Sequence, residues 1–389
     1  MNAFSYRVQT LQPSAIREIL KFTADPEVIS FAAGNPAPEA FPTEEIARIT
    51  NEILTTTPID ALQYSITEGY TPLRNWIKDD LKKKGMFNEN DEDVVITSGA
   101  QQAIEVVTKE ICNEGDTIIC EAPTFIGSLN AFRSYNAKLV GVEMEDDGIN
   151  IDKLEKALIE NPRTAFIYLI PNFQNPTGKT MSLEKRKAVL ALAQKYNVYI
   201  LEDNPYIGEN VPTIKSLDKN GNVLYAGTFS KTLAPGLRVG YLCAPKNVIA
   251  KAVVCMQVST VHTSILPQMI TYKFVTENDF EQHLEKLREI YKRKSDLMLT
   301  NLKMKMPKSI KFTEPEGGLF IWGTLPDGDM PYFCKKAVKN KVAVVPGNAF
   351  LTDENAPCLS FRLNYSTPTD EQIEKGVDIL AEVASTMYR

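Results

Sequence analysis

The sequence predicts an α/β protein with a mostly parallel, doubly wound sheet in a large domain, followed by a smaller α+β domain. Between about residues 43 and 275, short apolar strands alternate with amphipathic helices. These strands are apolar along their whole length, which is typical of a parallel sheet covered by helices on both faces. After about residue 280 the alternation stops, and a long charged helix leads into hairpin-like strands.

The large domain is predicted over residues 43–279. Its strands are expected at residues 94–97, 117–120, 138–142, 166–170, 198–201 and 223–227. A helix over residues 101–113 is ended by Gly115, and a second over residues 182–196 has Ser182 as its candidate cap. Helices between consecutive strands are the connections that a parallel sheet requires.

The remaining residues are predicted to form an arm and a small domain. The arm covers residues 1–42, with a short helix over residues 15–23 capped by Ser14, and it is expected to join the small domain. The small domain covers residues 280–389, with a helix over residues 280–302 and strands in GGLFIWGTL and LSFRLNYS. A closing helix carries an apolar stripe made of Ile373, Val377, Leu380 and Ala384.

The composition excludes several functional classes. The chain has 389 residues and a net charge of −6, without blocks of Lys or Arg, which argues against a nucleic-acid binder. No apolar run approaches a membrane span, so we expect a cytoplasmic protein that does not bind membranes. The six cysteines form no CxxC pair, and two histidines cannot build a three-His site, so no metal is expected.

Polar residues directly follow four of the predicted strands. In an open α/β sheet, ligands bind outside the carboxyl ends of the strands, so these residues are the candidates for a site. They are Ser98-Gly99-Ala100-Gln101, the run Pro171 to Gly178 that contains Asn175, the run Glu202 to Tyr206 that contains Asp203, and Thr228-Phe229-Ser230-Lys231.

These residue types suit pyridoxal 5′-phosphate (PLP). The turn at residues 98–101 opens a helix, whose N–H groups and dipole favour a phosphate, and Arg238 offers a second positive charge. The amine of Lys231 can form a Schiff base with an aldehyde. Asp203 can keep a ring nitrogen protonated, while the amide of Asn175 and the phenol of a nearby tyrosine can bond a ring oxygen.

Eight motifs then stand in order along the chain. They are SFAAGNPAPEAFP, ALQYSITEGYTPLR, ITSGAQQAI, EAPTF, IPNFQNPTGKT, LEDNPY, GTFSKTLAPGLRVGY and LSFRLNYS. This ordered set resembles the fold-type I, PLP-dependent class I/II aminotransferases along essentially the whole chain. It is most similar to the branch that contains the 2-aminoadipate and kynurenine aminotransferases.

The resemblance implies a role for each matching position at the cofactor. Lys231 would be the Schiff-base lysine, Asp203 the partner of the pyridine nitrogen, and Tyr206 with Asn175 the partners of the ring oxygen. Phe125 would stack on the ring. The phosphate would be held by Ser98, Gly99, Ala100, Gln101, Thr228 and Arg238.

The resemblance also implies substrate and subunit contacts. Arg362 would bind the substrate α-carboxylate, with Asn175 and Gly34 beside it, and the arm would cover the active site. Alternation in LSFRLNYS places Leu359, Phe361 and Leu363 on one face and Arg362 on the other. Tyr64 would reach the phosphate of a neighbouring subunit, which implies a homodimer with shared sites.

Arg17 has two interpretations. In aminoadipate-type relatives an arginine in this arm helix meets the distal carboxylate of the substrate, and SAIREIL resembles their segment. The alternative is a solvated charge, because Ile16, Ile19, Leu20 and Thr23 form the inward stripe and leave Arg17 beside it.

The function implied by the resemblance is transfer of an amino group between an L-amino acid and a 2-oxo acid such as 2-oxoglutarate. The amino acid would be acidic, such as 2-aminoadipate or glutamate, with aliphatic or aromatic donors also possible. One alternative is a PLP-dependent β-lyase of the same fold. Another is a non-catalytic, PLP-binding regulator domain, although such regulators place a helix-turn-helix module ahead of this fold and only a short arm precedes it here.

Overall fold

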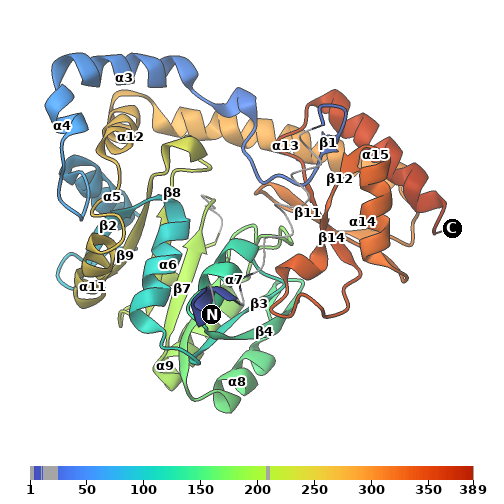
Figure 1. Cartoon of the computed structure of the whole chain (residues 1–389), viewed down its shortest axis with the longest axis horizontal. Coiled ribbons are helices and arrows are strands. Elements are labelled where there is room, and N and C mark those ends of the chain that lie inside the picture. The colour runs from blue at the N-terminus through green and yellow to red at the C-terminus, as the bar shows by residue number, and fades with distance from the viewer. Residues whose placement is uncertain (1–3, 10, 12–24, 207–210, 389) are drawn as a thin grey trace.

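A computed structural model describes residues 4–9, 11, 25–206 and 211–388 (Figure 1). The helix expected over residues 15–23, with Arg17, lies outside the described residues. The described chain contains an eight-stranded sheet, a four-stranded sheet and the helices packed on them. Short elements outside these layers are α1 (Tyr6–Gln9), α4 (Pro58–Leu62), η1 (Pro38–Ala40), η2 (Pro235–Leu237) and η3 (Gly347–Phe350).

The large sheet confirms the predicted α/β class. In spatial order its strands are β2 (Glu92–Thr97), β9 (Gly240–Pro245), β8 (Val223–Thr228), β7 (Tyr199–Asn204), β6 (Thr164–Leu169), β3 (Thr117–Ala122), β4 (Lys138–Glu145) and β5 (Gly148–Ile149). The run from β8 to β4 is parallel, whereas β9 and β5 are antiparallel to their neighbours. Strand β9 was not predicted, because Gly240 and Pro245 at its two ends are residues that usually interrupt strands.

Helices cover both faces of this sheet. One face packs against α6 (Gly99–Ile111), α7 (Ile126–Arg133) and α11 (Lys246–Gln257). The other packs against α3 (Thr43–Thr56), α5 (Thr71–Lys83), α8 (Ile151–Glu160), α9 (Leu183–Tyr196), α10 (Ile214–Leu217) and α12 (Ile265–Glu277). Phe166 and its neighbour Ile167 are both fully buried in different clusters, one on each face. Burial on both faces is why the strands are apolar at successive positions.

Local capping fixes helix α9 as the sequence predicts. The side chain of Ser182 accepts a hydrogen bond from the backbone N–H of Lys185, so an otherwise unpaired donor of the first turn is satisfied. The helix ends at Asn197, which adopts the left-handed conformation with φ 52°.

The smaller sheet has the order β10 (Lys311–Phe312), β11 (Phe320–Thr324), β14 (Ser360–Asn364) and β13 (Val345–Pro346), all antiparallel. It packs with α13 (Phe280–Lys305), α14 (Met330–Lys339) and α15 (Asp370–Ser385). Figure 1 shows α13 running from the helices of the large sheet to this smaller body. From the N-terminal side, β1 (Ile29–Ser30) pairs in parallel with β12 (Val342–Ala343), so this part of the arm packs with the C-terminal elements.

Two expectations for this region need correction. Strands β11 and β14 pair directly, yet they are not a hairpin, because α14, β12 and β13 lie between them in the sequence. Phe361 and Leu363 are fully buried as the alternation predicts, whereas Leu359 lies before the strand begins and is 38% exposed.

The described helices include none that is both long and apolar enough to cross a bilayer. The described residues also contain no group of three or more His, Cys, Asp or Glu side chains arranged to hold a metal ion.

Candidate active site

Lys231 lies at the edge of the sheet where the parallel strands end, three residues beyond β8. Its Nζ donates a hydrogen bond to the carbonyl oxygen of Gly34, at 2.7 Å. Burial, and then the charges of Arg362 and Arg238, lower the pKa of Lys231 to about 8. A larger fraction of this amine is therefore neutral, and nucleophilic, than of an ordinary lysine at the same pH.

Asp203 lies on the neighbouring strand β7 and is buried. Its Oδ2 accepts a hydrogen bond from the hydroxyl of Tyr168 at 2.7 Å, whereas Oδ1 is buried without a partner among the described residues. Burial raises the pKa of Asp203 to about 6, and the bond from Tyr168 opposes this rise. A buried carboxylate oxygen without a donor is costly, so Oδ1 is suited to receive an N–H group from a bound molecule.

An anion cradle forms where β2 leads into α6. Gly99, at the start of the helix, has φ +71°, and a Cβ at this position would lie 2.3 Å from Nη2 of Arg238. That same nitrogen donates to the carbonyl oxygen of Ser98 at 2.8 Å. The hydroxyl of Thr228 donates to Oγ of Ser230 at 2.9 Å, and Nη1 of Arg238 reaches this oxygen at 3.5 Å. A helix N-terminus, two hydroxyls and a guanidinium thus converge, as phosphate binding requires.

The other predicted residues of this corner lie beside the cradle. Ala100 and Gln101 belong to the first turn of α6, and Nε2 of Gln101 donates to the carbonyl oxygen of Gly127 at 2.9 Å. Phe125 is the N-cap residue of α7. A Cβ at Gly127 would lie 2.5 Å from the Phe125 ring and 2.6 Å from the Gln101 side chain, so both side chains meet above this glycine.

Arg362, on β14, contacts both the loop after β6 and the arm. Nη1 donates to Oδ1 of Asn175, in the loop after β6, and Nη2 donates to the carbonyl oxygen of Ala32, in the arm, both at 2.8 Å. The guanidinium carbon lies 4.1 Å from the centre of the Phe320 ring and 4.8 Å from that of Phe350. Burial lowers the pKa of Arg362 to about 9, so the side chain remains a cation at pH 7.

Tyr206 lies near Arg362, and Gly34 contacts Lys231. Tyr206 is buried two residues after β7, and burial raises the pKa of its hydroxyl while the positive charge of Arg362 opposes the rise. A Cβ at Gly34 would lie 3.0 Å from the ring of Phe320. Tyr206, Lys231 and Phe173 line one cavity of about 500 Å³, together with residues of α13 and of the loop before β11.

Not every predicted residue joins this group. Tyr64 is 81% exposed and packs edge-on against His262, with ring centroids 6.0 Å apart. Arg17 lies outside the described residues. Conversely, Tyr168 is absent from the residues predicted for the site, and Ser230 is among them only as part of the run Thr228 to Lys231, without a role of its own. The position of Ser230 next to Lys231 could have indicated a role for its hydroxyl, whereas Tyr168 is indistinguishable from the other residues of an apolar strand.

Comparison with known proteins decides the family. A model of the family described as "Aminotransferase class I and II" matches residues 26–380. The chain belongs to this family. It is 40% identical to aromatic-amino-acid aminotransferase 1 of Thermococcus litoralis, over 97% of this chain and 93% of that protein.

Two solved aminotransferase structures show the same arrangement. The kynurenine aminotransferase of Pyrococcus horikoshii, solved in complex with PMP, is 36% identical with a TM-score of 0.94, over 100% of this chain and 98% of that one. The α-aminoadipate aminotransferase of Thermus thermophilus, complexed with N-(5′-phosphopyridoxyl)-L-leucine, is 35% identical with a TM-score of 0.91, over 99% and 97%. These similarities confirm the predicted fold type and the predicted branch of the family.

The protein is therefore a PLP-dependent aminotransferase whose substrates are amino acids, that is, small molecules. The residues present fit the cofactor on three structural observations. The unpartnered Oδ1 of Asp203 can accept a hydrogen bond from a protonated ring nitrogen. The cradle at Gly99 and Arg238 offers donors for a phosphate. Lys231 offers an amine of lowered pKa.

Proposed function

We propose that this enzyme transfers the amino group of an acidic L-amino acid, such as 2-aminoadipate or glutamate, to a 2-oxo acid such as 2-oxoglutarate, with aliphatic or aromatic amino acids as further donors. The observation that carries this proposal is the buried guanidinium of Arg362, fixed by Asn175 at the same edge of the sheet as Lys231. A buried cation beside an amine suits a substrate that carries an α-carboxylate. The range of donors is supported by relatives named for aromatic amino acids, kynurenine and aminoadipate.

The proposed cofactor contacts follow the geometry of the site. Asp203 pairs with the ring nitrogen, Tyr206 and Asn175 bond the ring oxygen, and Phe125 stacks on the ring. The phosphate is held by Ser98, Gly99, Ala100, Gln101, Thr228 and Arg238. When bound, PLP supplies an electron-poor ring that stabilises negative charge developing on the substrate Cα.

The remaining chemistry belongs to side chains of this protein. Arg362 holds the substrate carboxylate as a bidentate partner, which fixes the bond from Cα that faces Lys231 and favours loss of the proton over loss of CO₂. The neutral amine of Lys231 would be the base whose Nζ accepts that proton. The lowered pKa of Lys231 keeps a part of this amine unprotonated at neutral pH.

The proposal includes a homodimer in the cytoplasm, in which Tyr64 contacts the phosphate bound by the other subunit. Two segments expose large apolar side chains, Ile59, Leu62, Tyr64, Ile66, Val258 and Val261. They are joined by the Tyr64–His262 ring contact and by a hydrogen bond from the Ser65 N–H to Nε2 of His262 at 3.3 Å. Apolar side chains gathered in this way are typical of a subunit interface. The six cysteines are free, which suits a reducing compartment.

We also propose that the chain divides into an arm over residues 1–42, a large domain over residues 43–279 and a small domain over residues 280–389. It is supported by the pairing of β1 with β12 and by the separate apolar clusters of the two bodies.

The test is a product assay with the PLP-loaded enzyme and 2-oxoglutarate, using L-2-aminoadipate, L-leucine and L-phenylalanine as donors. We expect equal amounts of the new 2-oxo acid and of glutamate, without ammonia, and the highest kcat/KM with L-2-aminoadipate. Release of ammonia from a β-substituted amino acid, without glutamate formation, would instead identify a β-lyase.

A further inference from the structure

A chain of buried hydroxyl groups reaches Asp203 from the core of the large sheet. The Oγ of Ser128, on α7, donates to the hydroxyl of Tyr168, on β6, and this hydroxyl donates to Oδ2 of Asp203; both distances are 2.7 Å. All three residues are buried. The Tyr168 ring packs edge-on against Phe132, with centroids 5.3 Å apart, inside an apolar cluster.

When Asp203 is ionised, the hydrogens of these two hydroxyl groups have one consistent arrangement. An ionised Asp203 is solely an acceptor, so the single hydrogen of Tyr168 points to Oδ2, and the hydrogen of Ser128 points to the Tyr168 oxygen. Both dipoles therefore direct their positive ends toward the carboxylate, and each strengthens the other in an apolar setting. These two hydroxyl groups leave the other carboxylate oxygen of Asp203, Oδ1, without a donor.

A second buried carboxyl group provides a contrast. Glu121, at the end of β3, accepts from the backbone N–H of Ile170 at 3.1 Å and from Nε2 of Gln174 at 3.3 Å. Burial raises the pKa of Glu121 to about 8, so this group is mostly neutral at pH 7. Burial and the charge of Asp203 raise the pKa of Glu121, although the two bonds that Glu121 accepts lower it. Asp203 is just as enclosed, and the hydroxyl of Tyr168 is the contact that favours its charged form.

We infer that Tyr168 and Ser128 are positioning residues for the cofactor: they keep Asp203 ionised and leave its Oδ1 available to the ring nitrogen of PLP. This inference rests on the proposed pairing of Asp203 with that nitrogen. Tyr168→Phe deletes one hydroxyl and leaves Oδ2 without a donor, so protonation of Asp203 becomes easier. Because a hydrogen bond to a charged group is involved, we expect the midpoint of the Asp203 titration to rise by about one to two pH units.

The direct test uses the apoprotein labelled with ¹³C at the aspartate carboxyl carbons. The Asp203 resonance is assigned by its loss in Asp203→Asn, and its shift is followed from pH 4 to pH 9. Tyr168→Phe should raise the midpoint, and Ser128→Ala should raise it by less, because the Tyr168 bond survives. The matched control is Tyr199→Phe, which also removes one tyrosine hydroxyl, but at the start of β7, at the opposite end of that strand from Asp203. This variant should leave the Asp203 midpoint unchanged.

A second measurement uses enzyme loaded with PLP that is ¹⁵N-labelled in the ring. The ¹⁵N shift reports the protonated fraction of the ring nitrogen, which should fall in Tyr168→Phe and in Asp203→Asn but not in Tyr199→Phe. If Asp203→Asn leaves this ¹⁵N shift unchanged, the proposed pairing of Asp203 with the ring nitrogen is wrong. The apoprotein titration would still show whether the hydroxyl groups of Tyr168 and Ser128 keep Asp203 ionised.

An unchanged Asp203 midpoint in folded Tyr168→Phe overturns the inference. If that variant does not fold, as judged by its near-ultraviolet circular dichroism, Ser128→Ala decides. A raised midpoint in Ser128→Ala supports the hydroxyl chain, and an unchanged one overturns it.

Discussion

At the scale of single residues, the geometry of Arg362 matters more than its charge. Its two terminal nitrogens already bind Asn175 and the arm carbonyl of Ala32, and two aromatic rings enclose its plane. A lysine at this position keeps the positive charge but loses both the fork of donors and the flat surface.

We therefore predict that Arg362→Lys lowers kcat/KM for the amino donor about 100-fold or more while PLP stays bound. The measurement is steady-state kinetics together with the cofactor content of the purified variant. The control is Arg163→Lys, at an exposed arginine paired with Asp116. A kcat/KM equal to that of the wild type would remove Arg362 from substrate binding.

The sequence predicts residues whose side chains follow strand ends, because topology alone brings those ends together. That argument predicts Lys231, Asp203 and Asn175. In the structure Asp203 and Lys231 lie at the ends of adjacent strands, and Asn175 contacts Arg362, whose charge lowers the pKa of Lys231. The sequence could not predict that Ser128 and Tyr168 belong to the site, since a hydroxyl inside an apolar strand or helix leaves the hydrophobic pattern unchanged. Nor could the sequence alone predict that Arg362 would be enclosed by Phe320 and Phe350, which are distant along the chain.

At the scale of elements, the turn from β2 into α6 depends on two properties of Gly99. Its φ of +71° is strained for any residue with a Cβ, and the added carbon would collide with Nη2 of Arg238. Gly115 offers a matched case, with φ +79° and, in the part of the chain that the structure describes, no atom within 4 Å of an added Cβ.

We predict that Gly99→Ala weakens PLP binding about tenfold or more, because Arg238 must move away from the cradle. Gly115→Ala should cost about 1 kcal/mol of stability through backbone strain, yet leave PLP binding unchanged. Both effects follow from titrating the apoproteins with PLP and from urea unfolding. Equal PLP affinities for the two variants would contradict the placement of Arg238 at the phosphate.

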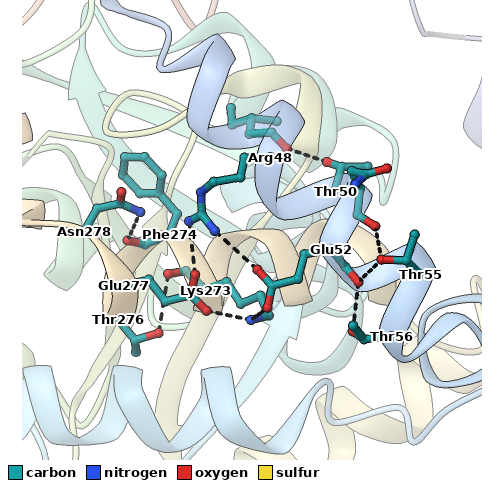
Figure 2. Close-up of polar contacts among 12 residues, drawn as sticks. Arg48, Thr50, Glu52, Thr55, Thr56, Lys273, Phe274, Thr276, Glu277 and Asn278 are labelled. Carbon is teal, nitrogen blue, oxygen red and sulfur yellow. Dashed lines mark hydrogen bonds and ion pairs between the residues drawn. The ribbon is translucent and has the colours of Figure 1, made fainter.

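Helices α3 and α12 are linked by a ring of four charged side chains (Figure 2). Arg48 contacts Glu52 at 3.2 Å and Glu277 at 3.1 Å, while Lys273 contacts the same two carboxylates at 2.7 and 2.6 Å. Each cation thus bridges both anions, and an arrangement of this kind is more effective than an isolated surface pair.

We predict that Glu277→Gln lowers the free energy of unfolding by about 0.5 to 1 kcal/mol at low ionic strength, and by less in 1 M salt. The hydrogen bond from Lys273 is the main cause that lowers the pKa of Glu277 in the folded protein. The stabilisation is therefore present above the unfolded-state pKa and is lost as the pH falls through the lower folded-state pKa. Urea unfolding at two salt concentrations and across pH 3 to 7 measures both effects.

The control for this ring is Glu160→Gln, at an exposed glutamate whose contact with Lys156 is 3.8 Å long. A loss of stability in Glu277→Gln that is equal in low and high salt would assign the effect to packing and not to charge.

At the scale of the whole molecule, the α/β class and the family were predicted from the alternation of strands and helices and from the ordered motifs, and both are confirmed. The antiparallel strand β9 was missed because its terminal Gly and Pro resemble loop residues. The division into an arm and two domains, and the assembly of two subunits, stay predictions, because contacts between distant segments or separate chains leave no periodic signal in the sequence.

The dimer makes a specific prediction. We take Tyr64 to contact the phosphate bound by the other subunit. A dimer of two Lys231→Ala subunits, or of two Tyr64→Ala subunits, is then impaired at both of its active sites. After unfolding and refolding together, half of the dimers are mixed, and each mixed dimer has one intact site. We expect about a quarter of the wild-type activity to return. Activity no higher than the average of the two separate variants would show that Tyr64 does not act across the interface.

The most direct test of the whole account is chemical trapping of the cofactor at Lys231. The PLP-loaded enzyme is reduced with borohydride, digested and analysed by mass spectrometry, with and without prior addition of L-glutamate. We predict a pyridoxyl group on Lys231 without the donor, and loss of this label, with one equivalent of 2-oxoglutarate per site, when L-glutamate is added first. A label on another lysine, or a Lys231 label that no amino donor removes, would contradict the account.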